Sequence, residues 1–363
     1  MIKYLGSKRT LIPLILDAVA LFPRARTVVD LFSGTARVGH ALKARGYRVL
    51  ANDHNAYALT LARAYVEADR DEVLADAARL VRELNQLPGR AGYFTETFCV
   101  RSRFFQPRNG ERVDAIREAI AAKGLGPGLE SVLLAALLEA ADRVDSTTGV
   151  QMAYLKRWAP RASRDLELRV PELLPRARHG RGAAFGLEAA AAAAALEGDV
   201  AYLDPPYNQH SYRGNYHIWE TLVRWDKPEV YGTACKRVDC RTYQSPFNSK
   251  RRFREAFAAV LARVRAPHLI VSFSDEGFLS AAELTGMLET RGRVATLSRP
   301  YRRYVGARIG IYNPRGEKVG RVSHLHNREH LFVCSEQALP DLAALDPMPA
   351  SAGRAGARSD RPS

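Results

Sequence analysis

Residues 27–39 read TVVDLFSGTARVG and combine a short apolar run with a glycine-containing turn. The run from Thr27 to Phe32 is rich in β-branched and apolar residues, which favour a buried strand. Residues 38–45 resume a helical pattern, and the segment 47–51, YRVLA, predicts a second strand. A strand, a glycine turn, a helix and another strand form a βαβ unit, so the sequence predicts an α/β fold.

The same alternation returns in the second half of the chain. Strands are predicted at 199–203, 268–273, 293–298 and 330–335, and the last two are expected to pair. Helices are predicted at 11–22, 55–69, 189–195, 251–264 and 279–291.

The segment 65–180 has a different texture, with a charged amphipathic helix at 70–87 and an aromatic, basic stretch at 93–112. Further helices are predicted at 113–123 and 130–144. We therefore expect three parts: a core from 1–64 and 181–336, an inserted domain from 65–180, and a disordered tail at 337–363.

The composition limits the class of protein. Lysine and arginine total 54 against 39 aspartates and glutamates, a formal net charge of +15. This excess favours a polyanionic partner such as nucleic acid, although a basic protein without such a partner is the alternative. No apolar run is long enough to cross a membrane and no secretory signal is present, so we expect a cytoplasmic protein. Four scattered cysteines and no histidine cluster predict free thiols and no metal site.

Two features indicate an adenosine cofactor. Gly34 lets a ligand approach the backbone where a helix begins, although Ala36 breaks the usual spacing of glycines. Asp53 follows the second strand and could accept hydrogen bonds from both ribose hydroxyls. Alternatively, Asp53 or Asn55 caps the next helix. These features do not distinguish a nicotinamide dinucleotide from S-adenosylmethionine.

The sequence Asp204-Pro205-Pro206-Tyr207 follows the apolar run 200–203. Ligands bind open α/β sheets at the carboxyl ends of strands, which is where Asp204 would lie. The prolines make the turn rigid and remove two donors, so local carbonyls remain as acceptors. A carboxylate beside a carbonyl suits an exocyclic amine, and Tyr207 offers a face on which a base could stack. The alternative is a proline-terminated strand with a surface tyrosine.

These motifs together resemble a known family. KYLGSK at 3–8, DLFSGTARVG at 30–39, Asp53, DPPY at 204–207 and HLFVC at 330–334 are similar to the D12-class (Dam-like) DNA adenine-N6 methyltransferases, in their alpha-type motif order. The resemblance covers most of residues 1–335. It implies a class I S-adenosylmethionine-dependent methyltransferase fold, Rossmann-like with a mostly parallel seven-stranded sheet, and an inserted, mainly helical DNA-recognition domain.

The resemblance also implies an activity and its residues. The expected reaction is methyl transfer from S-adenosylmethionine to adenine N6 in double-stranded DNA after base flipping, without a covalent protein nucleophile. The catalytic residues would be Asp204, Pro205, Pro206 and Tyr207. The cofactor contacts would be Tyr4, Lys8, Phe32, Gly34, Asp53 and Asp204. Glu188 is a poorer match to a third cofactor position, and Ser7 and Ala36 stand where glycine is commoner.

Contacts to DNA phosphates are expected from two regions. The residues are Lys156 and Arg157 of the insertion and Arg302, Arg303 and Arg308 of a late loop, with a solvated basic face as the alternative for each. Phe104 and Phe105 are expected to pack in the core. Methylation of cytosine N4 or of RNA adenine stays open, as do a nicotinamide-dependent oxidoreductase and a non-catalytic nucleic-acid-binding protein. The DNA site, the oligomeric state and a cognate restriction endonuclease are not decided by the sequence.

Overall fold

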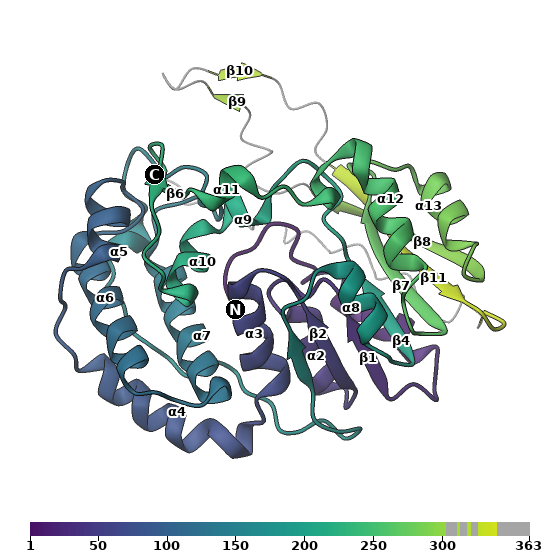
Figure 1. Ribbon diagram of the computed structural model, residues 1–363, viewed down its shortest axis with the longest axis horizontal. Coiled ribbons are helices and arrows are strands. Elements are labelled where there is room, and N and C mark those ends of the chain that lie inside the picture. Colours follow the sequence, from purple (N-terminus) through teal and green to yellow (C-terminus); the bar gives the residue numbers. More distant parts are fainter. Residues whose placement is uncertain (303–310, 313–317, 321–325, 340–363) are drawn as a thin grey trace, which may run out of the picture.

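The computed structural model describes residues 1–302, 311–312, 318–320 and 326–339. Its central element is a seven-stranded sheet in the order β3-β2-β1-β4-β7-β11-β8 (Figure 1). The strands are β1 (Thr27–Asp30), β2 (Arg48–Asn52), β3 (Ala183–Phe185), β4 (Val200–Leu203), β7 (His268–Ser274), β8 (Arg293–Arg302) and β11 (His326–Ser335). Neighbouring strands from β3 to β7 are parallel, whereas β11 runs antiparallel to both β7 and β8. The predicted mostly parallel α/β sheet and the pairing of its last two strands are confirmed.

Both faces of the sheet are apolar because helices cover both. Val28, Val200 and Ile270 belong to one buried cluster. The alternate positions belong to the other, as in Val29 and Ala201. The first face is covered by α1 (Ile12–Ala20), α2 (Arg37–Ala44) and α3 (Ala56–Ala62). The second face is covered by α8 (Ala189–Ala195), α12 (Lys250–Leu261) and α13 (Ala281–Leu288).

A helical body, defined as residues 63–163, occupies the connection between β2 and β3. It consists of η1 (Arg63–Glu67), α4 (Arg70–Asn85), α5 (Tyr93–Thr95), η2 (Glu96–Val100), α6 (Pro107–Ala122), α7 (Pro127–Val144) and η3 (Pro160–Ser163). Helix α7 is its centre, since nearly every residue from 131 to 142 is buried. Phe104 and Phe105 are buried in the same apolar cluster, as expected. This cluster continues to the first face of the sheet, and the domain boundaries at 65 and 180 stay a prediction.

The segment after β4 joins this body. It contains α9 (Tyr212–Asn215), α10 (His217–Arg224), β5 (Val230–Tyr231), β6 (Lys236–Arg237), α11 (Asp239–Thr242) and η4 (Pro246–Asn248). Helix α10 packs against α3 and α7, and Figure 1 shows it between the helical body and the sheet. Two further short strands, β9 (Ile311–Tyr312) and β10 (Lys318–Gly320), pair with each other. Most of the tail predicted to be disordered lies outside the described residues.

Membrane-spanning helices and metal-binding clusters can be assessed only for the described residues. Within the described ranges, none of the helices combines the length and the apolar character needed to cross a membrane. Over the same ranges, histidine, cysteine and acidic side chains form no group of three that could hold a metal ion.

Candidate active site

A pocket lies where β1, β2 and β4 end, at the carboxyl edge of the sheet. Residues of the N-terminal loop, of the turns after these strands and of the segment 211–248 form its walls. All nine residues predicted to bind the cofactor or act in catalysis line it: Tyr4, Lys8, Phe32, Gly34, Asp53, Asp204, Pro205, Pro206 and Tyr207. The structure therefore brings these residues into one cavity. Their individual roles stay proposals.

The glycine turn fits closely against its neighbours. Gly34 has φ +53°, a left-handed conformation that side chains disfavour. A Cβ atom there would lie 3.2 Å from the Tyr4 ring, so a larger residue would have to displace this wall of the pocket. Ala36 is also left-handed, with φ 59°, at a position where the family more often has glycine. The methyl group is fully buried, and the left-handed conformation costs about 1 kcal/mol relative to glycine.

Asp53 connects the glycine turn to the second strand. Its Oδ2 atom accepts a hydrogen bond from the Gly34 N–H at 3.0 Å, and its Oδ1 atom accepts from the N–H and side-chain amide of Asn55. Asn55 occupies the N-cap position of α3, but its side chain makes no cap hydrogen bond. A carboxylate has about four acceptor sites, so Asp53 retains capacity for a ligand hydroxyl.

Asp204 and Glu329, a residue of β11, both contact the buried ammonium group of Lys8. The Lys8 ammonium lies 3.2 Å from Asp204 Oδ1 and 3.5 Å from Glu329 Oε2, and its side chain is 6% exposed. Burial raises the pKa of Asp204 to about 6, while Lys8 lowers it and Glu329 raises it. The Asp204 carboxyl is therefore ionised at neutral pH and becomes protonated in mild acid. Glu329 was not predicted, because an acid in a closing strand gives no sequence signal of its own.

Aromatic rings form another wall. Tyr4 stacks on Tyr216 with ring centroids 4.6 Å apart and on Tyr212 at 5.2 Å, and its hydroxyl lies 3.1 Å from that of Tyr57. The Tyr207 ring packs against Phe273 at 4.8 Å and lies 5.6 Å below the Lys8 ammonium. Tyr207 is therefore held at the pocket edge rather than placed freely on the surface.

Several polar atoms in the pocket lack partners. Nine buried side-chain nitrogen or oxygen atoms of the described residues make no hydrogen bond. Five of them belong to residues that line this pocket: Asp30 Oδ1, Arg37 Nε, His54 Nε2, Asn55 Oδ1 and Arg213 Nε. Buried polar atoms are rarely left unpaired, so this concentration fits a polar ligand that would complete them.

The wall from 211 to 248 was not foreseen as part of the site. Tyr212, Arg213, Tyr243 and Asn248 line the pocket, and the Tyr243 hydroxyl donates to Glu188, which also lines it. Glu188, the poorer match to a third cofactor position, thus lines the same pocket, and its role stays a proposal. Tyrosines and arginines scattered through a segment without clear periodicity gave no signal that they converge.

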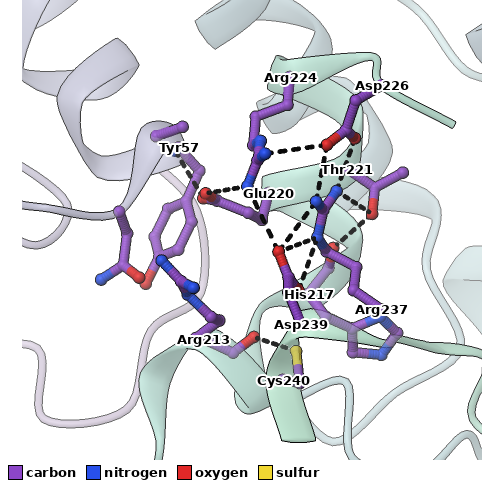
Figure 2. Close-up of polar contacts among 12 residues, drawn as sticks. Tyr57, Arg213, His217, Glu220, Thr221, Arg224, Asp226, Arg237, Asp239 and Cys240 are labelled. Carbon is purple, nitrogen blue, oxygen red and sulfur yellow. Dashed lines mark hydrogen bonds and ion pairs between the residues drawn. The ribbon is translucent and has the colours of Figure 1, made fainter. Parts of the chain in front are cut away.

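A buried ionic network holds this wall to α10 (Figure 2). The Arg237 guanidinium donates to both carboxylate oxygens of Asp226 at 2.7 Å and also to Asp239, and its side chain is 2% exposed. Arg224 contacts the same two aspartates and Glu220. Glu220 in turn accepts from the Tyr57 N–H at 3.2 Å, so the network reaches α3.

The predicted phosphate contacts are only partly placed. Lys156 and Arg157 are exposed in the helical body and do not line the pocket. Arg302 ends β8, but its side chain lies outside the described part of the chain, as do Arg303 and Arg308 entirely. All five stay predictions.

Comparison with known proteins agrees with this geometry. A family model described as D12 class N6 adenine-specific DNA methyltransferase matches residues 4–264. The chain is 30% identical over 312 residues to the type II methyltransferase M.NlaIII of Neisseria lactamica, covering 84% of this chain and 90% of that protein. It is also 30% identical to the type II methyltransferase M.FokI of Planomicrobium okeanokoites, covering 83% of this chain but 49% of that protein. M.CviAII of Paramecium bursaria Chlorella virus 1, another type II methyltransferase, is 26% identical over 84% of this chain and 92% of its own length.

The chain therefore spans about half of M.FokI and about nine tenths of M.NlaIII and M.CviAII. The family match covers well over half of the sequence and includes the glycine turn, Asp53 and the DPPY turn. This chain belongs to the D12 class of N6 adenine-specific DNA methyltransferases.

Proposed function

We propose that the chain transfers a methyl group from S-adenosylmethionine to N6 of an adenine extruded from double-stranded DNA. One observation carries this proposal: Asp204, Gly34 and Asp53 line the same pocket. An acceptor for an amine thus lies beside a turn and an acid suited to an adenosine cofactor. The cofactor supplies a methyl group on a sulfonium that leaves as a neutral thioether.

Asp53 and the glycine turn would hold the cofactor. Asp53 can still accept hydrogen bonds from the ribose hydroxyls. Because Gly34 has no side chain, a ligand can lie close to the backbone of this turn. Phe32 packs edge-on against Phe247 at 5.2 Å, which gives the pocket an apolar side where an adenine ring could lie.

Asp204 and the Pro205 carbonyl would accept the two N–H groups of the target amine. These bonds localise the nitrogen lone pair and stabilise the positive charge that develops on the nitrogen as the new carbon–nitrogen bond forms. The methylated nitrogen must then lose one proton, and an ionised Asp204, which would already accept a hydrogen bond from this nitrogen, could accept it. Because the pKa of Asp204 is raised to about 6, it would return this proton to solvent readily at neutral pH.

Tyr207 would stack on the extruded base. A base inside the duplex cannot reach Asp204, so the enzyme must flip it out at a cost of a few kcal/mol. Stacking on one aromatic face returns roughly 1–3 kcal/mol. The contacts of Tyr207 with Phe273 and Lys8 fix its ring before the base arrives.

The DNA backbone would follow the rim segment, defined as residues 208–252. This segment has nine lysines and arginines against four acids, whereas 65–180 has eighteen against seventeen. Arg241, Lys250, Arg251 and Arg252 are exposed and form no ion pair with a described residue. Three of them open α12, where a helix dipole disfavours cations and favours a bound anion. Figure 1 shows α9, α11 and α12 along the upper side of the molecule.

The test is to incubate the protein with radiolabelled S-adenosylmethionine and mixed-sequence DNA and to digest the product to nucleosides. We expect the label on N6-methyladenine. Label on N4-methylcytosine would contradict the proposed base, and label on RNA but not on DNA in a parallel reaction would contradict the proposed substrate. Because relatives are type II methyltransferases, the proposal extends to DNA modification in a restriction-modification system with a cognate endonuclease. The test is whether DNA methylated by this protein is protected from cleavage by that endonuclease.

A further inference from the structure

Two exposed apolar side chains flank a lysine on the surface of the molecule. Met152 is 48% exposed and Val238 is 38% exposed. The Lys236 ammonium lies 3.1 Å from the Met152 sulfur, so the segment after α7 contacts the hairpin of β5 and β6. Val238 follows Lys236 by two residues, and Arg237 between them points inward to Asp226. We call Met152, Lys236 and Val238 the surface patch.

The backbone at Met152 is fixed by the buried residue before it. The Gln151 N–H donates to the Asn215 carbonyl at 2.7 Å. The Gln151 carbonyl lies 3.0 Å from Nε2 of His217, and burial lowers the pKa of His217 to about 3, so a neutral ring can donate to this carbonyl. Asn215 ends α9, which supplies part of the pocket wall. The surface patch is therefore held next to an element of the active site.

The charge around the surface patch suits DNA. The segment 147–163, which contains Met152, has three lysines or arginines and no acid. Lys236 and Val238 belong to the rim segment, where nine lysines and arginines stand against four acids. Figure 1 shows β6, α9 and α11 along the upper side of the molecule. Because the surface patch is continuous with the rim segment, a polyanion that follows this segment would meet it.

The chemistry of the surface patch matches one base edge. In the major groove thymine presents an acceptor, O4, beside a methyl group, and the other three bases carry no such methyl. The Lys236 ammonium can donate to O4, while Met152 and Val238 offer apolar atoms to the methyl group. Burial lowers the pKa of Lys236, and its hydrogen-bond partner is a thioether, which is a weak acceptor. A carbonyl oxygen such as O4 would be a stronger partner for this ammonium.

We propose that the surface patch contacts a thymine of the duplex beside the extruded adenine, an inference that rests on the proposed function. Every duplex substrate contains such a base, because the partner of the target adenine is a thymine that stays in the duplex when the adenine leaves. Met152 precedes the DPPY turn and the hairpin follows it. Base contact would therefore not be confined to the segment 65–180.

The experiment compares two DNAs of one sequence, amplified with either thymidine or deoxyuridine triphosphate, which differ in the methyl groups of thymine. The wild type should methylate the thymine DNA with a kcat/KM roughly 3- to 10-fold higher, since burying one methyl group is worth about fourfold. In the double variant Met152→Ala, Val238→Ala this ratio should fall below about 1.5.

The matched control is Leu74→Ala, which truncates an apolar side chain on α4 that is 42% exposed and lies outside the surface patch. It should keep the wild-type ratio. An unchanged thermal unfolding midpoint shows that each variant is folded.

Two results would overturn the inference and leave the proposed function intact: a ratio near one in the wild type, or the same ratio in the wild type and the double variant. A ratio lost equally in Leu74→Ala would also overturn it, because the preference would not depend on the surface patch. If the wild type methylates neither DNA, the proposed function fails together with this inference.

Discussion

Lys8 and Glu329 shift the pKa of Asp204 in opposite directions, so replacing either residue should change the pH dependence of activity. Lys8 lowers the pKa of Asp204 by its positive charge, and Glu329 raises it by its negative charge. The Lys8 ammonium contacts both carboxylates, so the three groups form one coupled set. The protonated form of Asp204 cannot stabilise the charge that develops on the amine, so activity should fall as pH drops through about 6.

We predict that replacing Lys8 and replacing Glu329 shift the low-pH limit of activity in opposite directions. In Lys8→Met the pKa of Asp204 rises, so activity is lost at a higher pH than in the wild type. In Glu329→Gln the pKa falls, so activity persists to a lower pH. Single-turnover rates measured from pH 5 to 8 at saturating cofactor would show both shifts. Displacement in the same direction, or no displacement, would mean that another group controls this limit.

The ionic network around Arg237 is the element that fixes the unforeseen wall of the pocket. It fastens β6 and α11 to α10 (Figure 2). Because Tyr243 directly follows α11, the network also helps to position this residue. Removing one partner of a buried pair leaves uncompensated charge behind. The two aspartates are 32% exposed, which lets water take over part of the interaction.

We predict that Arg237→Met lowers the free energy of unfolding by roughly 2–3 kcal/mol, toward the lower end for buried pairs. Arg254→Met is the matched control, since Arg254 pairs with Glu283 while both side chains are about half exposed. It should cost less than about 1 kcal/mol. Equal losses in denaturant titrations of the two variants would show that the buried network has no special role.

Elements with a strong local pattern could be predicted from the sequence. The apolar runs that became β1, β2, β4 and β7 stood between turn residues, and each was placed within a few positions. β3 could not be predicted, because Ala183–Phe185 is only three residues long and becomes a strand by pairing with β2. Helix α6 begins at Pro107, earlier than expected, because aromatic residues just before it obscured the helical period.

The same distinction holds within the pocket. Gly34, Asp53 and Asp204 follow strands in recognisable motifs, so their convergence could be predicted. The stacking of Tyr212, Tyr216 and Tyr57 around Tyr4 could not be predicted. These rings come from α9, from the junction of α9 and α10, and from α3, and they meet only once α10 packs against α3. Glu329 was also missed, since its contact with Lys8 depends on how the last strand pairs in the sheet.

At the scale of the whole molecule, the positive charge is unevenly distributed. The 65–180 segment expected to recognise DNA is nearly neutral overall, with many of its cations in ion pairs. The rim segment beside the pocket has an excess of five positive charges. DNA held by the rim segment would pass directly over the site where a base must be extruded. The helical body would then contribute shape and base contacts more than charge.

We predict that the rim segment determines the salt dependence of DNA binding. Replacing Lys250, Arg251 and Arg252 with alanine should reduce the slope of log affinity against log salt by up to about 3, since each phosphate that is no longer neutralised lowers it by about 0.9. The control replaces Arg70, Arg79 and Arg169, which are exposed, already paired with acids, and equal in total charge. An equal change in the control would show that the rim segment contributes no more to the salt dependence than the segment 65–180 does.

The most direct test of the central claim is the single-turnover rate of methyl transfer by Asp204→Ala, with cofactor and DNA saturating. If this carboxylate stabilises the charge on the attacking amine, the rate should fall roughly 100- to 1000-fold while S-adenosylhomocysteine still binds. A rate within about twofold of the wild type would show that the chemistry does not depend on Asp204 and would contradict the account.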